Sequence, residues 1–205
     1  GRGFDPRQSR HLAFFERQCT FIQCIFSLAR QFSSHLHGCF QRQLLHQRRQ
    51  QNGSEFLPLH QHKVIAISCV LREGDIFKVW SLGAPGEPEG QLIKRFFDGI
   101  EKYTPNVVSW NGGGFDFPVL HYRAMINSVQ APRYWDMGED DKDFKWNNYI
   151  SRYHTRHLDL MDLLAMYQGR ANAPLDDMAQ LCGFPGKLGM DGSKVWDAYQ
   201  QGEIE

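Results

Sequence analysis

Acidic side chains follow two apolar stretches of this 205-residue sequence, in a pattern that suits metal-assisted chemistry. The stretch SWNGGGFDFPVL holds Asn111, three glycines and Asp116, and the stretch HLDLMDLL holds Asp159 and Asp162. Carboxylates that emerge from neighbouring strand ends can share hard cations such as Mg²⁺. A pair of such ions activates water and stabilises the leaving oxygen in phosphodiester cleavage. We therefore take Asp116 and Asp159 as the candidate metal ligands.

Simpler roles are also open to these side chains. Asp is a favoured helix N-cap, so Asp116 could instead stabilise the following helix by about 1 kcal/mol. Asp162 would suit the first turn of a helix, where a carboxylate interacts favourably with the helix dipole. Asp159 lies between Leu158 and Leu160 and has no such simple role. The glycines match neither GxGxxG nor GxxxxGK[ST], so neither a dinucleotide site nor a P-loop is indicated.

Two further polar groups are weaker candidates for a metal. HTRH (154–157) holds two histidines three residues apart, which could reach one metal from a helix, but no third ligand lies nearby in the sequence. EDDKD (139–143) is typical of a solvated loop that would hold a cation only loosely.

From residue 53 the sequence alternates between strand and helix patterns. We expect strands over 62–72, 76–82 and 106–112, helices over 91–103, 117–128, 173–184 and 193–205, a strand that continues as a helix over 157–167, and a long excursion over 133–153. The short turn at 72–75 makes the first two strands a hairpin, and the remaining connections are parallel crossovers. This order predicts an α/β fold with a mixed sheet. Ligands collect at the carboxyl ends of strands in such sheets, which is where Asp116 would lie.

Residues 1–52 differ from the rest of the chain. They hold nine Gln and eight Arg and carry a net charge of +6, whereas residues 53–205 carry −6. No strand pattern is visible there, and the apolar residues of FFERQCTFIQCIFSLARQF keep no clean helical period. Two interpretations stay open. The segment is either a genuine basic arm, which would suit nucleic acid, or a non-native or disordered start, as a shifted reading frame would produce.

The composition is that of a soluble globular protein, with 41% hydrophobic and 22% charged residues. No apolar run reaches the roughly 18 residues of a membrane span, and the first residues do not resemble a secretory signal. The five cysteines are odd in number and form no CxxC pair, which favours reduced thiols over a disulfide framework or a zinc site. We therefore expect a cytoplasmic protein without membrane contact.

Four stretches in order resemble the predicted 3′–5′ exonucleases related to the proofreading domain of family-B DNA polymerases. The resemblance covers about residues 54–205 and depends on the order of SEFLPLHQHKVIAISCVLR, RFFDGIEKYTPNVVSWNGGGFDFPVLHYRA, RYWDMGEDDKDFKWNNYISRYHTRHLDLMDLL and LCGFPGKLGMDGSKVWDAY. It implies a ribonuclease H-like fold of the DEDD type, an α/β mixed sheet flanked by helices, here incomplete at both ends. Residues 53–205 would form this truncated exonuclease domain, after the atypical segment 1–52.

The resemblance also implies roles for individual residues. The family's second acidic motif, an Asn, a short spacer and Phe-Asp, falls on Asn111, Phe115 and Asp116. Asp116 would then be catalytic, as a ligand of Mg²⁺ or Mn²⁺ in a two-metal site. Trp110, Asn111 and Phe115 would contact the substrate, since a base stacks on an aromatic ring for about 1–3 kcal/mol. Packing in the core is an equal alternative for Phe115.

Two of the family's three acidic motifs have no counterpart in this sequence. The first, Asp-x-Glu at the end of an initial strand, does not occur before residue 60. The third, Tyr-x-x-x-Asp, is not found, and Tyr199 with Glu203 mimics its spacing with the wrong acid. We therefore expect an incomplete member that lacks the central strand with two of the four catalytic carboxylates.

Three functions are consistent with these observations. The first is a metal-dependent 3′–5′ exonuclease that hydrolyses phosphodiester bonds at the 3′ ends of DNA, single-stranded DNA in particular, with activity impaired in this chain. The second is a non-catalytic nucleic-acid-binding module built from the basic arm and from aromatic residues that otherwise serve the core: Trp110, Phe115, Tyr134, Trp135, Trp146 and Tyr149. The third is an inactive fragment of such an exonuclease.

Overall fold

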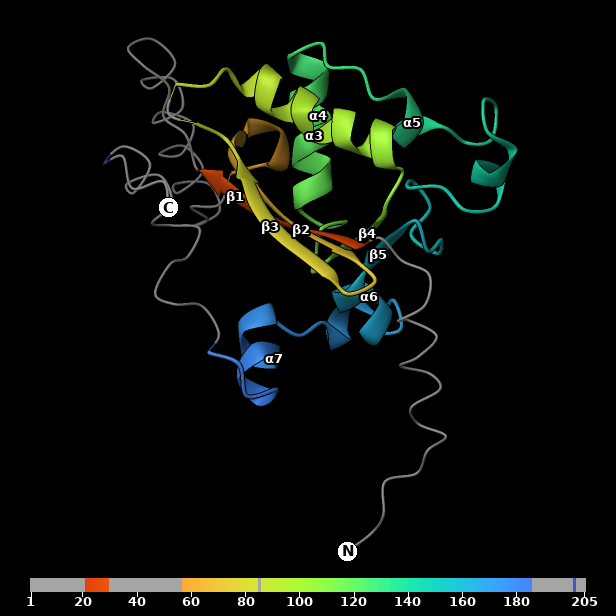
Figure 1. Ribbon diagram of the computed structural model, residues 1–205. Helices are drawn as coiled ribbons and strands as arrows, with labels where there is room; N and C mark the ends of the chain where they lie inside the picture. Colours follow the sequence, from red (N-terminus) through yellow and green to blue (C-terminus); the bar gives the residue numbers. More distant parts are fainter. Residues whose placement is uncertain (1–20, 30–56, 85, 186–200, 202–205) are drawn as a thin grey trace, which may run out of the picture.

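The computed structural model describes residues 21–29, 57–84, 86–185 and 201, and these form a five-stranded mixed sheet with flanking helices (Figure 1). The strands are β1 (Phe21–Ala29), β2 (Lys63–Glu73), β3 (Ile76–Leu82), β4 (Asn106–Ser109) and β5 (His157–Asp159). Their order in the sheet is β3-β2-β1-β4-β5. β1 and β3 pair antiparallel with β2, whereas β1, β4 and β5 run parallel. This is the predicted α/β arrangement, a mixed sheet flanked by helices.

The β2–β3 hairpin forms where the sequence predicts it. Ile76 pairs with Glu73 across the tight turn, in which Gly74 has a φ of 58° that favours glycine. Along β2 the buried residues include Val64, Ile67 and Cys69, which belong to the main hydrophobic core. The apolar residues of this strand therefore anchor the hairpin to the helices packed on that face.

The helices lie on both sides of the sheet. They are α3 (Glu89–Tyr103), α4 (Asp116–Ile126), α5 (Pro132–Trp135), α6 (Leu160–Leu164) and α7 (Leu175–Leu181), with 3₁₀ turns η1 (Leu59–Gln61), η2 (Lys142–Lys145) and η3 (Gly169–Ala171). In Figure 1, α3 and α4 lie on one side of the sheet, and α6 and α7 lie on the other. The predicted helices 91–103, 117–128 and 173–184 are confirmed, whereas 193–205 lies outside the described residues except for residue 201. Among the helices described, none has the length and apolar character needed to cross a bilayer.

The core lies between the sheet and α3 and α4. The predicted apolar face of α3 is fully buried, through Leu92, Ile93, Phe96, Phe97 and Ile100. It packs with side chains of β4 and α4 in one hydrophobic cluster. Burial of each large side chain stabilises the fold by about 1.5–3 kcal/mol, so this face holds α3 and α4 on the sheet.

The buried carboxylate of Glu89 ties the start of α3 to its neighbours. It accepts a hydrogen bond from the backbone N–H of Val64 in β2, at 2.8 Å. It also pairs with the guanidinium of Arg123 in α4, whose Nε lies 2.8 Å from Oε1. A buried charge must be paired and hydrogen-bonded to be tolerated. This network therefore fixes α4, which begins with Asp116, against the sheet.

β1 corrects the expectation that residues 1–52 contain no strand and that the central strand is missing. It pairs with β2 from Phe21 opposite Arg72 to Ala29 opposite Lys63, and it runs parallel to β4 through Gln23 opposite Val108. The segment FIQCIFSLA shows no clean alternation, so its strand conformation depends on these long-range partners. It contains no Asp or Glu. The rest of the basic segment lies outside the described residues.

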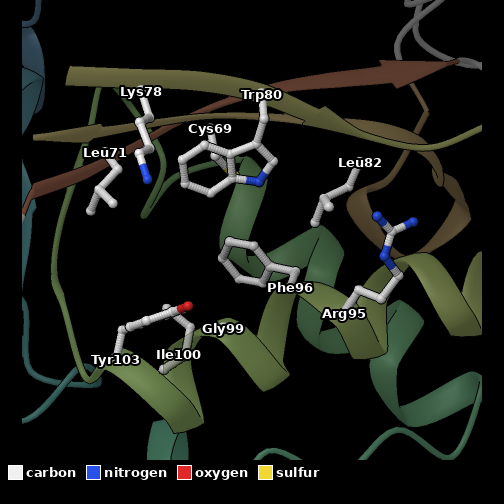
Figure 2. Close-up of a pocket in the computed structure, with 10 residues that line it drawn as sticks. All are labelled: Cys69, Leu71, Lys78, Trp80, Leu82, Arg95, Phe96, Gly99, Ile100 and Tyr103. Carbon is white, nitrogen blue, oxygen red and sulfur yellow. The ribbon is translucent and has the colours of Figure 1, made fainter.

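An apolar cavity of about 330 Å³ separates the hairpin from α3 (Figure 2). Trp80 and Leu71 line it from the sheet, and Phe96 lines it from the helix. Gly99 lies in the middle of α3, and a Cβ built on it would meet no atom within 4 Å. None of the lining residues belongs to the two acidic stretches.

Candidate active site

The carboxyl ends of β4 and β5 meet at one edge of the sheet. Ser109, the last residue of β4, pairs with Asp159, the last residue of β5, in a parallel register. The strand predicted over 106–112 therefore stops three residues early, and the chain turns through the glycine loop before α4. This arrangement brings the two acidic stretches together, although 46 residues separate Gly113 from Asp159 along the chain.

Asp159 holds the glycine loop with both of its carboxylate oxygens. The backbone N–H of Asn111 donates to Oδ1 at 2.8 Å, and the N–H of Gly113 donates to Oδ2 at 2.9 Å. Hydrogen bonds to a charged acceptor are about twice as strong as neutral ones. The carboxylate therefore fixes the loop that leads to Asp116.

The loop conformation depends on close packing more than on glycine's access to positive φ. The left-handed residue is Asn111, with a φ of 61°, and asparagine is among the residues that tolerate this region best. Its carbonyl accepts hydrogen bonds from the N–H groups of Gly114 and Phe115 at 3.1 and 3.0 Å. A Cβ on Gly112 would lie 2.5 Å from the Cβ of Ser109. Position 112 therefore requires glycine for lack of space.

Asp116 is the first residue of α4 and lies in a partly buried environment. The N-cap is Phe115, and no side-chain cap hydrogen bond is formed, so the alternative role of Asp116 as N-cap is wrong. Burial raises the pKa of Asp116 to about 7; a hydrogen bond to its own backbone opposes this rise, and the charge of Asp159 adds to it. Strongly perturbed carboxyl groups cluster at functional sites. Asp116 is therefore the candidate around which the site is built.

Trp110 and Phe115, the candidate substrate-binding aromatics, are each held by protein contacts. The indole N–H of Trp110 donates to the carbonyl of Ala173 at 3.0 Å and so anchors the segment that precedes α7. The ring of Phe115 meets the ring of His62 edge-on, with centroids 5.2 Å apart, and packs against the core. These contacts give both residues structural roles, and their contact with substrate stays a prediction, as it does for Asn111.

His157 is a member of the site that the spacing of HTRH does not explain. Its Nε2 lies 2.8 Å from Oγ of Ser109, and in the strand register His157 pairs with Val107, two residues before Ser109. Burial lowers the pKa of His157 to about 4, and the charge of Asp159 acts in the opposite direction. His154 instead accepts a hydrogen bond from the N–H of Asn148 at Nδ1. The two histidines therefore serve different partners, and only the strand pairing reveals the role of His157.

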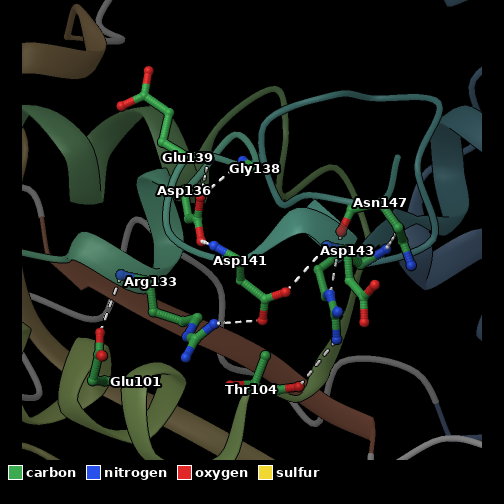
Figure 3. A network of polar contacts seen from close by, with 10 residues as sticks. Glu101, Thr104, Arg133, Asp136, Gly138, Glu139, Asp141, Asp143 and Asn147 are labelled. Atoms are coloured by element: carbon green, nitrogen blue, oxygen red, sulfur yellow. Dashed lines mark hydrogen bonds and ion pairs between the residues drawn. The ribbon is translucent and has the colours of Figure 1, made fainter. Parts of the chain in front are cut away.

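The acidic excursion is organised by hydrogen bonds within the protein (Figure 3). The carboxylate of Asp136 accepts from the backbone N–H groups of Gly138, Glu139 and Asp141 at 2.8–3.1 Å. Asp141 in turn pairs with Arg133 at 3.0 Å. These contacts lower the pKa of Asp136, because the backbone donors favour its charged form even though burial opposes it. The carboxylates of Asp136 and Asp141 therefore bind donors within the same segment of the chain.

The donor set for a two-metal centre is incomplete in the part of the chain that the structure describes. No three His, Cys, Asp or Glu side chains there form a group that could hold a metal ion. No ion pair to Asp116 is formed by the residues that the structure describes, so its carboxylate suits a bound cation. Each oxygen of Asp159 already accepts one backbone hydrogen bond. The described residues alone therefore do not supply the ligands for hydrolysis by a pair of metals.

A perturbed carboxyl group beside a glycine loop, at the carboxyl ends of parallel strands, lies where α/β sheets bind their ligands. One family matches this chain over residues 54–205: the predicted 3′–5′ exonucleases related to the exonuclease domain of PolB. The chain belongs to this family, which confirms the resemblance seen in the sequence. Membership implies the use of divalent metal. No curated protein sequence matches the chain.

Several solved structures of exonuclease I are similar to this chain at low identity. A product-bound form has 13% identity and a TM-score of 0.49, over 90% of this chain and 43% of that protein. The E. coli enzyme in a zinc-bound complex with single-stranded DNA has 13% identity and a TM-score of 0.48, over 90% and 40%. A complex of exonuclease I with SSB-Ct has 12% identity and a TM-score of 0.44, over 89% and 40%. The chain therefore spans less than half the length of each of these proteins.

Proposed function

We propose that this chain is a metal-dependent 3′–5′ exonuclease domain that acts slowly on the 3′ ends of single-stranded DNA. The observation that carries the proposal is Asp116, a partly buried carboxyl group with a pKa of about 7 beside the glycine loop at the end of β4. Family membership over residues 54–205 supports the class of reaction.

Asp116 is the residue that would hold a divalent cation. Such a cation, when bound, stabilises negative charge that develops on the reacting phosphate. Asp159 positions the loop through its two backbone hydrogen bonds, and metal binding by this carboxylate, with the lone pairs that remain, stays a prediction. Asn111 and Phe115 precede Asp116 in the chain and would contact the terminal nucleotide.

The slow rate follows from the composition of β1. This strand lies beside β4 in the sheet, where the family's Asp-x-Glu motif is expected, and FIQCIFSLA offers no carboxylate there. Removal of one preorganised electrostatic group from an active site commonly costs a factor of about 10²–10³ in rate. We therefore expect activity far below that of a member with all its acids.

A cleavage assay tests the proposal. The full chain is incubated with 5′-labelled single-stranded DNA, with Mn²⁺ or with a chelator. We expect a ladder of shortened products that needs the metal and disappears in Asp116→Asn. Asp98→Asn is the matched control, since Asp98 is an exposed acid paired with Lys94 on α3. Shortening that persists in the chelator, or that is equal in Asp116→Asn, contradicts the proposal.

The absence of acids from β1 also favours a second candidate, a nucleic-acid-binding module without catalysis. Such binding would weaken steeply with salt and would not need a metal, because released counterions would supply most of the free energy. Binding of this kind without any shortening of the DNA would select this second function. Binding that does not depend on salt would count against it.

A further inference from the structure

The cavity between the β2–β3 hairpin and α3 is built from one face of each element (Figure 2). Lys78, Trp80 and Leu82 alternate along β3, so their side chains point to the same side of the sheet. Leu71 and Cys69 of β2 pair with Lys78 and Trp80 across the hairpin and line the cavity as well. From α3 the lining residues follow the helical repeat: Arg95, Phe96, Gly99, Ile100 and Tyr103. The periods of strand and helix therefore bring these side chains to one shared space.

The floor of this cavity is buried and apolar, whereas its mouth is open to solvent. Phe96 and Ile100 on the floor are 4% and 1% exposed, but Tyr103 at the mouth is 60% exposed. Trp80 forms a half-buried wall between them. The cavity volume of about 330 Å³ lies within the roughly 300–1,000 Å³ that is typical of small-molecule sites. A ligand of modest size can therefore enter from solvent and reach the apolar floor.

Gly99 leaves this cavity open in the middle of α3. Glycine destabilises a helix interior relative to alanine. Neither a positive φ nor a close contact accounts for glycine here, because a Cβ at position 99 would meet no atom within 4 Å. The space that a side chain at this position would occupy is part of the cavity. The glycine therefore leaves room for a ligand beside the helix.

The charged groups that line the cavity are cations. They belong to Lys78 and Arg95, and no lining residue is acidic. Arg95 is already paired with Glu87 at 2.9 Å. Lys78 forms no ion pair among the residues that the structure describes, and Figure 2 shows its ammonium pointing from β3 towards the space above Tyr103. An anionic group on an apolar ligand would therefore bind at the Lys78 end, where the Tyr103 hydroxyl can also donate a hydrogen bond.

We propose that this cavity binds a small aromatic carboxylate, with its ring against Trp80 and Phe96 and its carboxylate paired with Lys78. Aromatic rings pack favourably on one another in offset or edge-on arrangements, which suits the flat side chains of the walls. The ammonium of Lys78 would give the carboxylate a charge-assisted hydrogen bond. None of the lining residues belongs to β4, β5 or the glycine loop. The inference therefore goes beyond the proposed function and does not depend on nucleic-acid binding.

The test uses naphthylacetate as the probe and naphthylethanol as its uncharged analogue. The indole N–H signal of Trp80, assigned with Trp80→Phe, is followed by NMR while each probe is added to the full chain. We expect saturable shifts with both probes and about tenfold tighter binding of naphthylacetate, because its carboxylate pairs with Lys78. Lys78→Gln should remove this preference and leave the binding of naphthylethanol unchanged. Lys94→Gln, at an exposed lysine of α3 outside the cavity, is the matched control and should keep the preference.

A second variant tests the cavity by filling it. Gly99→Leu places a side chain in the open space beside α3 and should abolish the binding of both probes. An unmoved Trp80 signal, equal affinities for the two probes in the wild type, or wild-type binding in folded Gly99→Leu would each overturn the site. Should Gly99→Leu fail to fold, Lys78→Gln still decides, because Lys78 is exposed on β3. No DNA or metal enters these measurements, so their failure is distinct from a failure of the proposed function.

Discussion

The two carboxylates at the strand ends have different environments, and this difference assigns their roles. Asp159 accepts a backbone hydrogen bond at each oxygen, so both oxygens are engaged with the glycine loop. Among the described residues, Asp116 has only its own backbone as a donor, and burial raises its pKa to about 7. A group that is costly to ionise inside the protein gains most from a bound cation. The site therefore separates a positioning acid from an acid available to a ligand.

The raised pKa of Asp116 predicts how stability changes with pH. Because the folded chain favours the protonated carboxyl, this contribution is complete below about pH 4 and is lost as the pH rises towards 7. Asp116→Asn removes the titration. In a metal-free buffer, the variant should gain roughly 2–4 kcal/mol of unfolding free energy relative to the wild type between pH 4 and 8, at about 1.4 kcal/mol per pKa unit. Denaturant unfolding at several pH values measures this, and parallel curves for the two proteins would refute it.

Replacement of Asp159 tests its role in holding the loop. Asp159→Asn places an amide NH₂ where one oxygen now accepts a backbone N–H, so one hydrogen bond is lost and one donor is left unpaired. We expect a loss of about 1–3 kcal/mol in stability and large shifts of the Asn111 and Gly113 amide signals in NMR spectra. Asp162→Asn is the control. Its ion pair with the half-exposed Arg152 should contribute less than about 1 kcal/mol, and a variant at 159 that behaves like this control would argue against a positioning role.

At the scale of elements, the hairpin and α3 could be predicted because their patterns are local. β2, β3 and α3 have the spacing of strand and helix faces, and Glu73 and Ile76 flank a short turn. The end of β4 could not be predicted. The sequence favours a strand to residue 112, but Asp159 draws the backbone of Asn111 and Gly113 out of the strand direction. No local pattern contains a contact made across 48 residues.

Two glycine substitutions with the same chemistry should have opposite effects on these elements. Gly99→Ala places a methyl group in open space in the middle of α3, so it should stabilise the protein by about 1 kcal/mol. Gly112→Ala forces a Cβ against the side chain of Ser109 at the end of β4, which should cost about 1–3 kcal/mol. Thermal unfolding of both variants measures the difference. Equal effects at the two positions would contradict the described packing of the loop.

For the whole molecule, the order of strands and helices predicted the mixed sheet and its flanking helices. The central position of β1 could not be predicted from the sequence. Its apolar residues have no clean period, and its strand conformation depends on pairing with β2 and β4. The meeting of the two acidic stretches at one edge of the sheet was predicted from the rule that ligand groups collect at strand ends. The roles of Ser109 and His157 were not foreseen, since they depend on packing between segments far apart in the chain.

Asp116 is proposed to hold a divalent cation at the end of β4, and a measurement of Mn²⁺ binding shows whether it does. Paramagnetic Mn²⁺ broadens the NMR signals of nuclei close to it, so amide spectra of the full chain can locate the ion. We predict selective broadening at Gly113, Gly114 and Asp116 in the wild type and in Asp98→Asn, and none there in Asp116→Asn. Sharp signals at these positions in the wild type, or broadening that survives in Asp116→Asn, would contradict the account.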